Sequence, residues 1–303
     1  MGDRNIFKRF LRRGFRRVVL IIGREGLGIG GYVGRIRIVK KIETKISKYM
    51  RPEFVMFKGH KIYLDEADAL RLSSFGTEYH ETDENKIYDT YIKEGDVVLD
   101  IGAFIGDNSL DFAKLVGNKG KVYAFEINKK SYELLKKNIE ANNYKNIIPL
   151  YKAVSNKTGK TSHYIHPFRS SGDKIHERDS LNNPIDWKVE EIECVRLDDF
   201  IKGRVDFIKV DTEGAEPLVF QGAQKVLKKN KNLKILLEFS PATAGNFGMT
   251  VEDFLKNFIK LGFKIYKAEG FMSATPVRIE QETIKNFLEE HQKKMLNLFL
   301  IRE

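Results

Sequence analysis

Cysteine is nearly absent from this chain, and so are several motifs that mark enzyme active sites. Only Cys194 among the 303 residues is a cysteine. One cysteine cannot form a disulfide framework or a multi-cysteine metal site, and it fits a reducing compartment. The sequence also has no P-loop, no HExxH pattern and no Asn-Pro-Pro-aromatic run. These absences exclude phosphate-loop NTPases, zincin-type metalloproteases and base methylases that act on an exocyclic amine.

Long hydrophobic runs are missing near the N-terminus, where the longest covers residues 18–22. A membrane-spanning helix needs about 20 apolar residues, so this region predicts neither a transmembrane segment nor the core of a signal peptide.

Acidic residues are also scarce near the N-terminus. Residues 1–51 hold 15 Lys and Arg against 3 Asp and Glu, whereas residues 52–303 hold 38 against 39. The net charge of +11 therefore comes from an N-terminal arm, and the nearly neutral body disfavours nucleic acid as a partner.

The arm, residues 1–51, is predicted to be a basic, partly helical leader to a domain that spans residues 52–303. Within its first 25 residues, bulky apolar side chains lie between Arg and Lys at helical spacing. Two interpretations stay open. Residues 1–25 lie on an anionic membrane surface as a peripheral helix, or their apolar side docks on the main domain. In both cases we expect a cytoplasmic protein.

The body alternates apolar runs with amphipathic segments. Residues 54–57 and 61–64 predict a β-hairpin, which is followed by a helix that ends near Lys93. Further strands are expected at residues 96–101, 121–126, 147–154, 161–165, 189–197, 205–211, 233–239, 263–267 and 297–301. Further helices are expected at residues 109–116, 130–142, 217–229, 251–261 and 280–295. This alternation predicts a doubly wound α/β fold, with a mostly parallel sheet and helices on both faces.

The strongest local signal is a strand that runs into a glycine turn at residues 97–106. Gly102 and Gly106 allow a sharp turn and a close approach of the backbone to a ligand. An acid, Asp100, precedes the first glycine, although a dinucleotide site keeps that helix terminus for its pyrophosphate. The turn therefore favours a ligand with a cationic amino group, such as S-adenosylmethionine. Glu126 ends the next strand and suits bidentate hydrogen bonding to a ribose diol.

The second signal lies at residues 205–216, where a buried strand is followed by several acids. Asp211 and Glu213 follow this strand at its carboxyl end, where doubly wound sheets bind their ligands. A carboxylate or a histidine there could take a proton from an alcohol. We therefore expect Asp211 and Glu213 as the first candidates for a general base, with His176 and His163 after them. Two acids make a small ligand set, so no metal is predicted.

Five motifs, in order, resemble those of the FkbM-type methyltransferases. They are residues 100–106 (DIGAFIG), 124–126 (AFE), 153–155 (AVS), 196–200 (RLDDF) and 206–216 (DFIKVDTEGAE). The resemblance covers residues 54–301 and implies a class I fold, with a seven-stranded sheet whose last strand is antiparallel. It also implies S-adenosylmethionine as the cofactor and methyl transfer to a hydroxyl of a sugar, glycan or small natural product. The expected cofactor-binding residues are Glu81, Asp100, Gly102, Ala103, Phe104, Gly106, Asn108, Glu126, Ile127, Ala153, Val154 and Asp211.

Two residues depart from the family pattern, and the acceptor side is the least defined. Phe104 stands where family members commonly have Asn, and Asp107 stands where an aromatic residue is common. The polar insert at residues 155–199 is expected to recognise the acceptor, or else to pack against the sheet edge. Two further hypotheses stay open. One is a methyltransferase-like binding protein that engages lipid or RNA through its arm, and the other is a nicotinamide-dependent dehydrogenase.

Overall fold

The computed structural model of the protein describes residues 53–64, 82–165, 175, 188–241, 249–273, 275–292 and 294–302. The predicted arm at residues 1–51, the predicted site residues Glu81 and His176, and most of the polar loop of the insert lie outside the described residues. The predictions made for them stay predictions. In the described part of the chain, no helix is both long enough and apolar enough to cross a membrane.

The described residues form one large sheet in the order β12-β11-β13-β10-β9-β3-β4-β5. Its strands are β3 (Val97–Ile101), β4 (Lys121–Glu126), β5 (Ile147–Tyr151), β9 (Phe207–Val210), β10 (Lys234–Phe239), β11 (Lys264–Lys267), β12 (Arg278–Ile279) and β13 (Leu296–Ile301). Neighbouring strands from β5 to β10 are parallel, whereas β13 runs antiparallel between β10 and β11. The predicted seven-stranded sheet with an antiparallel last strand is therefore confirmed. The two-residue β12 adds an edge strand that is too short to show an alternating pattern in the sequence.

Strand order places a topological switch point between β3 and β9. From β3 the chain adds β4 and β5 on one side, and later adds β9 and β10 on the other side. Ligands of doubly wound sheets bind outside the carboxyl ends of the strands at such a point. The turn after β3 and the loop after β9 meet there, and both carry predicted site residues.

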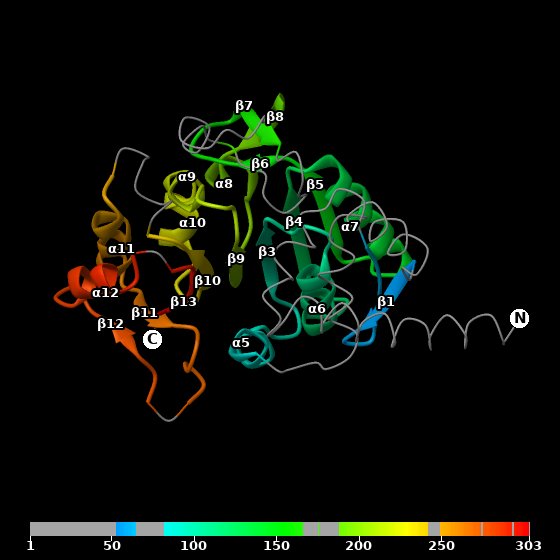
Figure 1. Ribbon diagram of the computed structural model, residues 1–303. Helices are drawn as coiled ribbons and strands as arrows, with labels where there is room; N and C mark the ends of the chain where they lie inside the picture. Colours follow the sequence, from blue (N-terminus) through cyan, green and yellow to red (C-terminus); the bar gives the residue numbers. More distant parts are fainter. Residues whose placement is uncertain are drawn as a thin grey trace, which may run out of the picture.

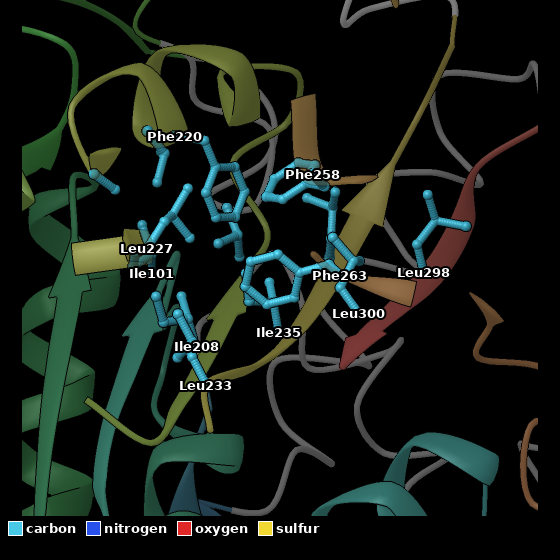
Figure 2. Close-up of a cluster of buried hydrophobic side chains, with 14 of the residues drawn as sticks. Ile101, Ile208, Phe220, Leu227, Leu233, Ile235, Phe258, Phe263, Leu298 and Leu300 are labelled. Carbon is cyan, nitrogen blue, oxygen red and sulfur yellow. The ribbon is translucent and has the colours of Figure 1, made fainter. Parts of the chain in front are cut away.

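Helices cover both faces of the sheet (Figure 1). One face packs against α5 (Asp83–Tyr91), α6 (Asp107–Val116) and α7 (Lys129–Ala141). The other packs against α8 (Leu197–Phe200), α9 (Glu216–Gln221), α10 (Gln224–Lys229), α11 (Val251–Lys260) and α12 (Ile284–Glu290). Figure 2 shows the second core, in which Ile208 and Ile235 of the sheet lie among helix side chains such as Phe220 and Phe258. Burial on both faces explains why the central strands read as continuous apolar runs.

Two predicted elements are each divided in the structure. The strand expected at residues 147–154 ends at Tyr151, and β6 (Ala153–Val154) leaves the main sheet to pair with β8 (Lys188–Val195). β8 also pairs with β7 (Gly159–Ile165), which completes a small three-stranded sheet formed largely by the insert. The helix expected at residues 217–229 is interrupted between α9 and α10. At the break, a Cβ on Gly222 would lie 2.1 Å from the carbonyl oxygen of Ser155, so the two backbones touch.

The predicted hairpin is confirmed as β1 (Phe54–Phe57) paired antiparallel with β2 (His60–Tyr63). Asn138 of α7 and Asn142, the residue that caps the C-terminus of α7, attach it to the domain. Asn142 exchanges two hydrogen bonds with the backbone of Lys61, and Asn138 does the same with the backbone of Tyr63. The amide of the fully buried Asn138 also donates to the carbonyl of Ile105, at 2.8 Å. One side chain therefore joins the hairpin, α7 and the glycine turn.

Asn138→Ala should destabilise the protein by about 1–3 kcal/mol, because it leaves a buried carbonyl and a strand backbone without their partners. Urea unfolding followed by circular dichroism measures this change. Asn142→Ala is the matched control, since its side chain bonds only partly buried groups, the hairpin backbone at Lys61 and the carbonyl of Asn138, and a smaller loss is expected. Equal losses in both variants would show that the link to Ile105 adds nothing.

Candidate active site

The turn after β3 is in direct contact with the loop after β9. Gly102 adopts a left-handed φ of +85°, and a Cβ placed on it would lie 1.7 Å from the backbone oxygen of Asp211. Gly106 also has a left-handed φ, and a Cβ there would lie 2.5 Å from the Cδ1 atom of Leu135 in α7. The expectation was that these glycines make room for a ligand. In the structure, the atoms that exclude a side chain belong to the protein itself, so the glycines fix how the two loops and α7 pack.

Glu126 holds the glycine turn through its carboxylate. One oxygen accepts the backbone N–H of Phe104 at 2.7 Å, and the other accepts the N–H of Asn128 at 2.6 Å. Phe104 has a left-handed φ of 52°, which asparagine tolerates better than other side chains with a Cβ. This geometry gives a physical reason for the asparagine that is common at this position in the resembling family. The buried Glu126 thus fixes a strained turn next to α6.

Asp100 is fully buried at the end of β3. One of its carboxylate oxygens accepts a hydrogen bond from the hydroxyl of Ser109 at 2.5 Å. The other, Oδ1, has no hydrogen-bond partner among the described residues. Burial raises the pKa of Asp100 to about 6, although the nearby Lys209 opposes this change. Asp100 is thus an acceptor that a cationic group would complete.

A row of polar side chains crosses one face of the sheet near the carboxyl ends of its strands. Asp100 is the register partner of Lys209, and Glu238 of β10 is the register partner of Asn297 of β13. Side chains two residues apart lie on the same face of a strand. Asp211, two residues after Lys209, therefore continues the row between Asp100 and Glu238.

The contacts between these side chains are short. Lys209 Nζ lies 3.3 Å from the Oδ2 atom of Asp211. Glu238 and Asp211 follow the register pair Leu237 and Val210, which brings their carboxyl groups within hydrogen-bond reach. At the far end of the row, Asn297 donates to Glu84 of α5 at 2.5 Å. The row therefore runs from the glycine turn to α5 as a line of neighbouring charged and polar groups.

Burial and mutual repulsion change how these groups titrate. Burial, followed by the hydrogen bond and the charge of Asp211, raises the pKa of Glu238 to about 9. Burial alone would lower the pKa of Lys209, but Asp211, Asp100 and Glu238 together raise it above its usual range. Burial also raises the pKa of Glu84. At neutral pH the row therefore holds a charged ammonium and at least one neutral carboxyl group.

The loop after β9 is organised by Glu216, which directly precedes the helix expected at residues 217–229. Its buried carboxylate accepts hydrogen bonds from the backbone N–H groups of Thr212 and Gly214 and from the Thr212 hydroxyl. Glu213, inside this loop, has a left-handed φ of 54°. Glu216 thus holds Asp211 and Glu213 in place, and Glu213 is kept in a conformation that costs free energy.

The remaining predicted site residues lie in several parts of the structure. Ala103 is buried in the turn, and Asn108 is half-buried in the first turn of α6. Ile127 and Ala153 pack in a small cluster with Ala215, beside the loop after β9. Val154, the next residue of β6, packs instead into the core shown in Figure 2. His163 is buried in β7, which belongs to the small sheet and not to the main sheet that carries the row.

Lys209, Glu238, Glu84 and Asn297 are residues of the site that the sequence analysis missed. A signal for two of them was present, because Lys209 and Glu238 are charged residues inside otherwise apolar strands near their carboxyl ends. Among the residues that the structure describes, no three His, Cys, Asp or Glu side chains are arranged to hold a metal ion.

Comparison with known proteins identifies the family. Residues 100–265, more than half of the chain, match the family described as "Methyltransferase FkbM domain". The chain belongs to the FkbM methyltransferase family. The cofactor of this class of methyltransferases is S-adenosylmethionine. The hypothesis of a nicotinamide-dependent dehydrogenase is therefore wrong.

Individual relatives are more distant. A protein of Saccharolobus solfataricus described as a "Probable cobalt-precorrin-6B C(15)-methyltransferase (decarboxylating)" is 41% identical over 61 residues. That match covers 20% of this chain and only 31% of the relative.

Solved structures resemble this FkbM chain only loosely. The methyltransferase FkbM of Methylobacillus flagellatus KT has 16% identity and a TM-score of 0.42, over 87% of this chain and 59% of that one. A SAM-dependent O-methyltransferase of Thermotoga maritima has 13% identity and a TM-score of 0.41, over 83% and 78%. An rRNA methylase of Streptococcus thermophilus has 11% identity and a TM-score of 0.40, over 75% and 99%. The family assignment rests on the domain match.

The residues of the FkbM domain fit S-adenosylmethionine. The buried Oδ1 atom of Asp100 has no partner within the described ranges, and it matches the cationic amino group of the cofactor. Asp100 is the register partner of Ala124, so Glu126, two residues further along β4, lies on the same face of the sheet. The rigid Glu126 carboxylate matches a ribose diol. We infer that Asp100 and Glu126 hold opposite ends of the cofactor across the glycine turn.

Cofactor binding should depend on pH through Asp100. Its pKa of about 6 means that it is neutral at lower pH and ionised at higher pH, and only the ionised form attracts an ammonium group. The affinity for S-adenosylmethionine should therefore rise about tenfold between pH 5 and pH 7. Calorimetric titration at several pH values measures this change.

Asp100→Asn should bind more weakly at pH 7 and lose this pH dependence. Asp89→Asn, on an exposed position of α5, is the control that should keep the wild-type profile. If Asp100→Asn kept the wild-type profile, another group would bind the cofactor's cation.

Proposed function

We propose that the protein transfers the methyl group of S-adenosylmethionine to a hydroxyl of a sugar, glycan or small natural product, with Asp211 as the general base. The observation that carries this proposal is the position of Asp211. Its backbone touches Gly102 of the cofactor turn, and its carboxylate lies 3.3 Å from the Lys209 ammonium. A carboxylate kept ionised at the edge of the cofactor site is suited to accept a hydroxyl proton.

The residues of the chain would have the following roles in the reaction. When bound, the cofactor would supply a methyl group on a sulfonium sulfur. An oxygen nucleophile would attack this methyl group in line and displace the sulfur. Asp100 and Glu126 orient the cofactor, since positioning supplies much of the acceleration of such a displacement. Asp211 accepts the proton of the acceptor hydroxyl, and Lys209 stabilises the ionised form of Asp211 before that transfer. Glu213, held in the same loop by Glu216, is the second candidate for the base.

Two observations support a small hydroxylic acceptor rather than RNA. The row at the carboxyl edge of the sheet holds more carboxyl groups than ammonium groups, and the charged groups that raise the pKa of Lys209 are all acidic. Such a surface repels a phosphate backbone. The insert also reaches the loop after β9, because its buried Ile175 packs in one cluster with Ala215. This contact supports a role of the insert in acceptor recognition.

Asp211→Asn should lower the rate of methyl transfer by about 10²–10⁴-fold, because it removes the proton acceptor while keeping the size of the side chain. The assay measures transfer from methyl-labelled S-adenosylmethionine to extracts and to a panel of sugars, glycans and small alcohols. Glu213→Gln tests the second candidate, and Asp89→Asn is the exposed control.

The outcomes separate the hypotheses. Loss of transfer in Asp211→Asn with unchanged cofactor affinity supports the proposal. A larger loss in Glu213→Gln would move the base to that residue. Wild-type protein that binds the cofactor and transfers no methyl group to any acceptor would instead support a binding protein with a methyltransferase fold.

A further inference from the structure

Glu238 and Asp211 form a contact that ordinary ionised carboxylates cannot make. Asp211 directly follows β9 and Glu238 lies at the carboxyl end of the neighbouring parallel strand β10, one register step beyond the pair Val210 and Leu237, so the two carboxyl groups lie side by side within hydrogen-bond reach. An ionised carboxylate only accepts hydrogen bonds, so one of the two groups must carry a proton. The same argument applies to any two carboxyl groups that share a site, because both cannot ionise at this distance.

The neighbours decide which group holds the proton. The Lys209 ammonium contacts Asp211 Oδ2, which favours the ionised form of Asp211. Glu238 is half-buried and faces the charges of Asp211 and Glu213, both of which disfavour its ionised form, while Lys209 opposes them only in part. From β13, the neutral amide of Asn297 stands opposite Glu238 and is bonded to Glu84 of α5. The proton therefore resides mainly on Glu238.

We propose that Glu238 is a positioning residue for the base Asp211: it carries the one proton that the pair shares at neutral pH and donates it to Asp211 in a hydrogen bond. This inference rests on the proposed function for the role of Asp211, but the shared proton does not. One oxygen of the Asp211 carboxylate lies beside Lys209, and the hydrogen bond from Glu238 orients the carboxylate further. The base is thereby held in a single orientation. A misplaced base loses much of its effect, since errors of about 1 Å can cost a hundredfold in rate.

The proton balance of the reaction follows from this arrangement. The O–H bond of the acceptor breaks and its proton moves to the Asp211 carboxylate, while the new O–C bond forms. The C–S bond of the sulfonium breaks and its electron pair stays on sulfur. After transfer both carboxyl groups of the pair are protonated, and one proton must leave to water before the next turnover.

The pH dependence of stability tests the shared proton without any acceptor. The pKa of Glu238 is raised from 4.5 to about 9 in the folded protein. Its stabilising contribution is therefore complete below about pH 4.5 and is lost as the pH rises to about 9. Glu238→Gln keeps a hydrogen-bond donor and cannot ionise, so its urea midpoint relative to wild type should rise steadily from pH 5 to pH 9. Glu289→Gln, at an exposed position of α12, should show no such trend.

Infrared spectra and rates complete the test. Wild type at pH 7 should show the carbonyl stretch of a protonated carboxylic acid, and Glu238→Gln should lose it. On an acceptor found by the screen above, Glu238→Ala should lower kcat about a hundredfold at pH 7. Glu238→Gln should lower kcat less, and its rate should lack the change that the wild-type rate shows near pH 9. Cofactor affinity should remain that of wild type in both variants.

Two results would overturn the inference. One is a Glu238→Gln variant with the same infrared band and the same pH dependence of stability as wild type. The other is a Glu238→Ala variant whose pH–rate profile matches that of wild type. Failure of the proposed function looks different, because wild-type protein would then show the shared proton and transfer no methyl group.

Discussion

The site depends on the ammonium of Lys209, which is buried in the sheet and surrounded by carboxyl groups. An isolated charge at that depth would cost many kcal/mol, so Lys209 is tolerated only because Asp100, Asp211 and Glu238 face it. The reverse also holds, because without the ammonium these acids would repel one another. The proposed cofactor side of the row, at Asp100, and the proposed acceptor side, at Asp211, thus share one cation.

A second constraint is the rigidity of the loops that carry these groups. Buried carboxylates bind the backbone of both loops, Glu126 at the turn after β3 and Glu216 at the loop after β9. The contact between Gly102 and Asp211 then fixes one loop against the other. The strained backbone at Phe104 and Glu213 is held by these bonds. Such a site is preorganised, which is how a methyltransferase that works by positioning gains most of its acceleration.

Much of this architecture could be predicted from the sequence. The glycine turn, Glu126 and the strand before Asp211 are local patterns, because each strand–turn–helix unit is encoded by consecutive residues. The antiparallel last strand followed from the resemblance to the family, and the structure bears it out. The branching of β6 into a second sheet and the interruption at Gly222 depend on contacts between distant backbones, so local periodicity could not show them.

The chemistry of the row was harder to predict for the same reason. Lys209, Glu238 and Asn297 become neighbours only through the strand order β3-β9-β10-β13, and the sequence does not state which strand lies beside which. Glu216 directly precedes the expected helix at residues 217–229, and its bonds to the loop after β9 appear only once that loop is folded. Residues of this kind are found by asking why a charged side chain interrupts a buried strand.

The most direct test of the account is a crystal structure of the protein with S-adenosylhomocysteine. The account predicts the adenosyl group over the turn at residues 102–106, the ribose hydroxyls on Glu126 and the amino group on the Oδ1 atom of Asp100. A ligand bound elsewhere on the sheet, or bound in this place with its amino group away from Asp100, would contradict it.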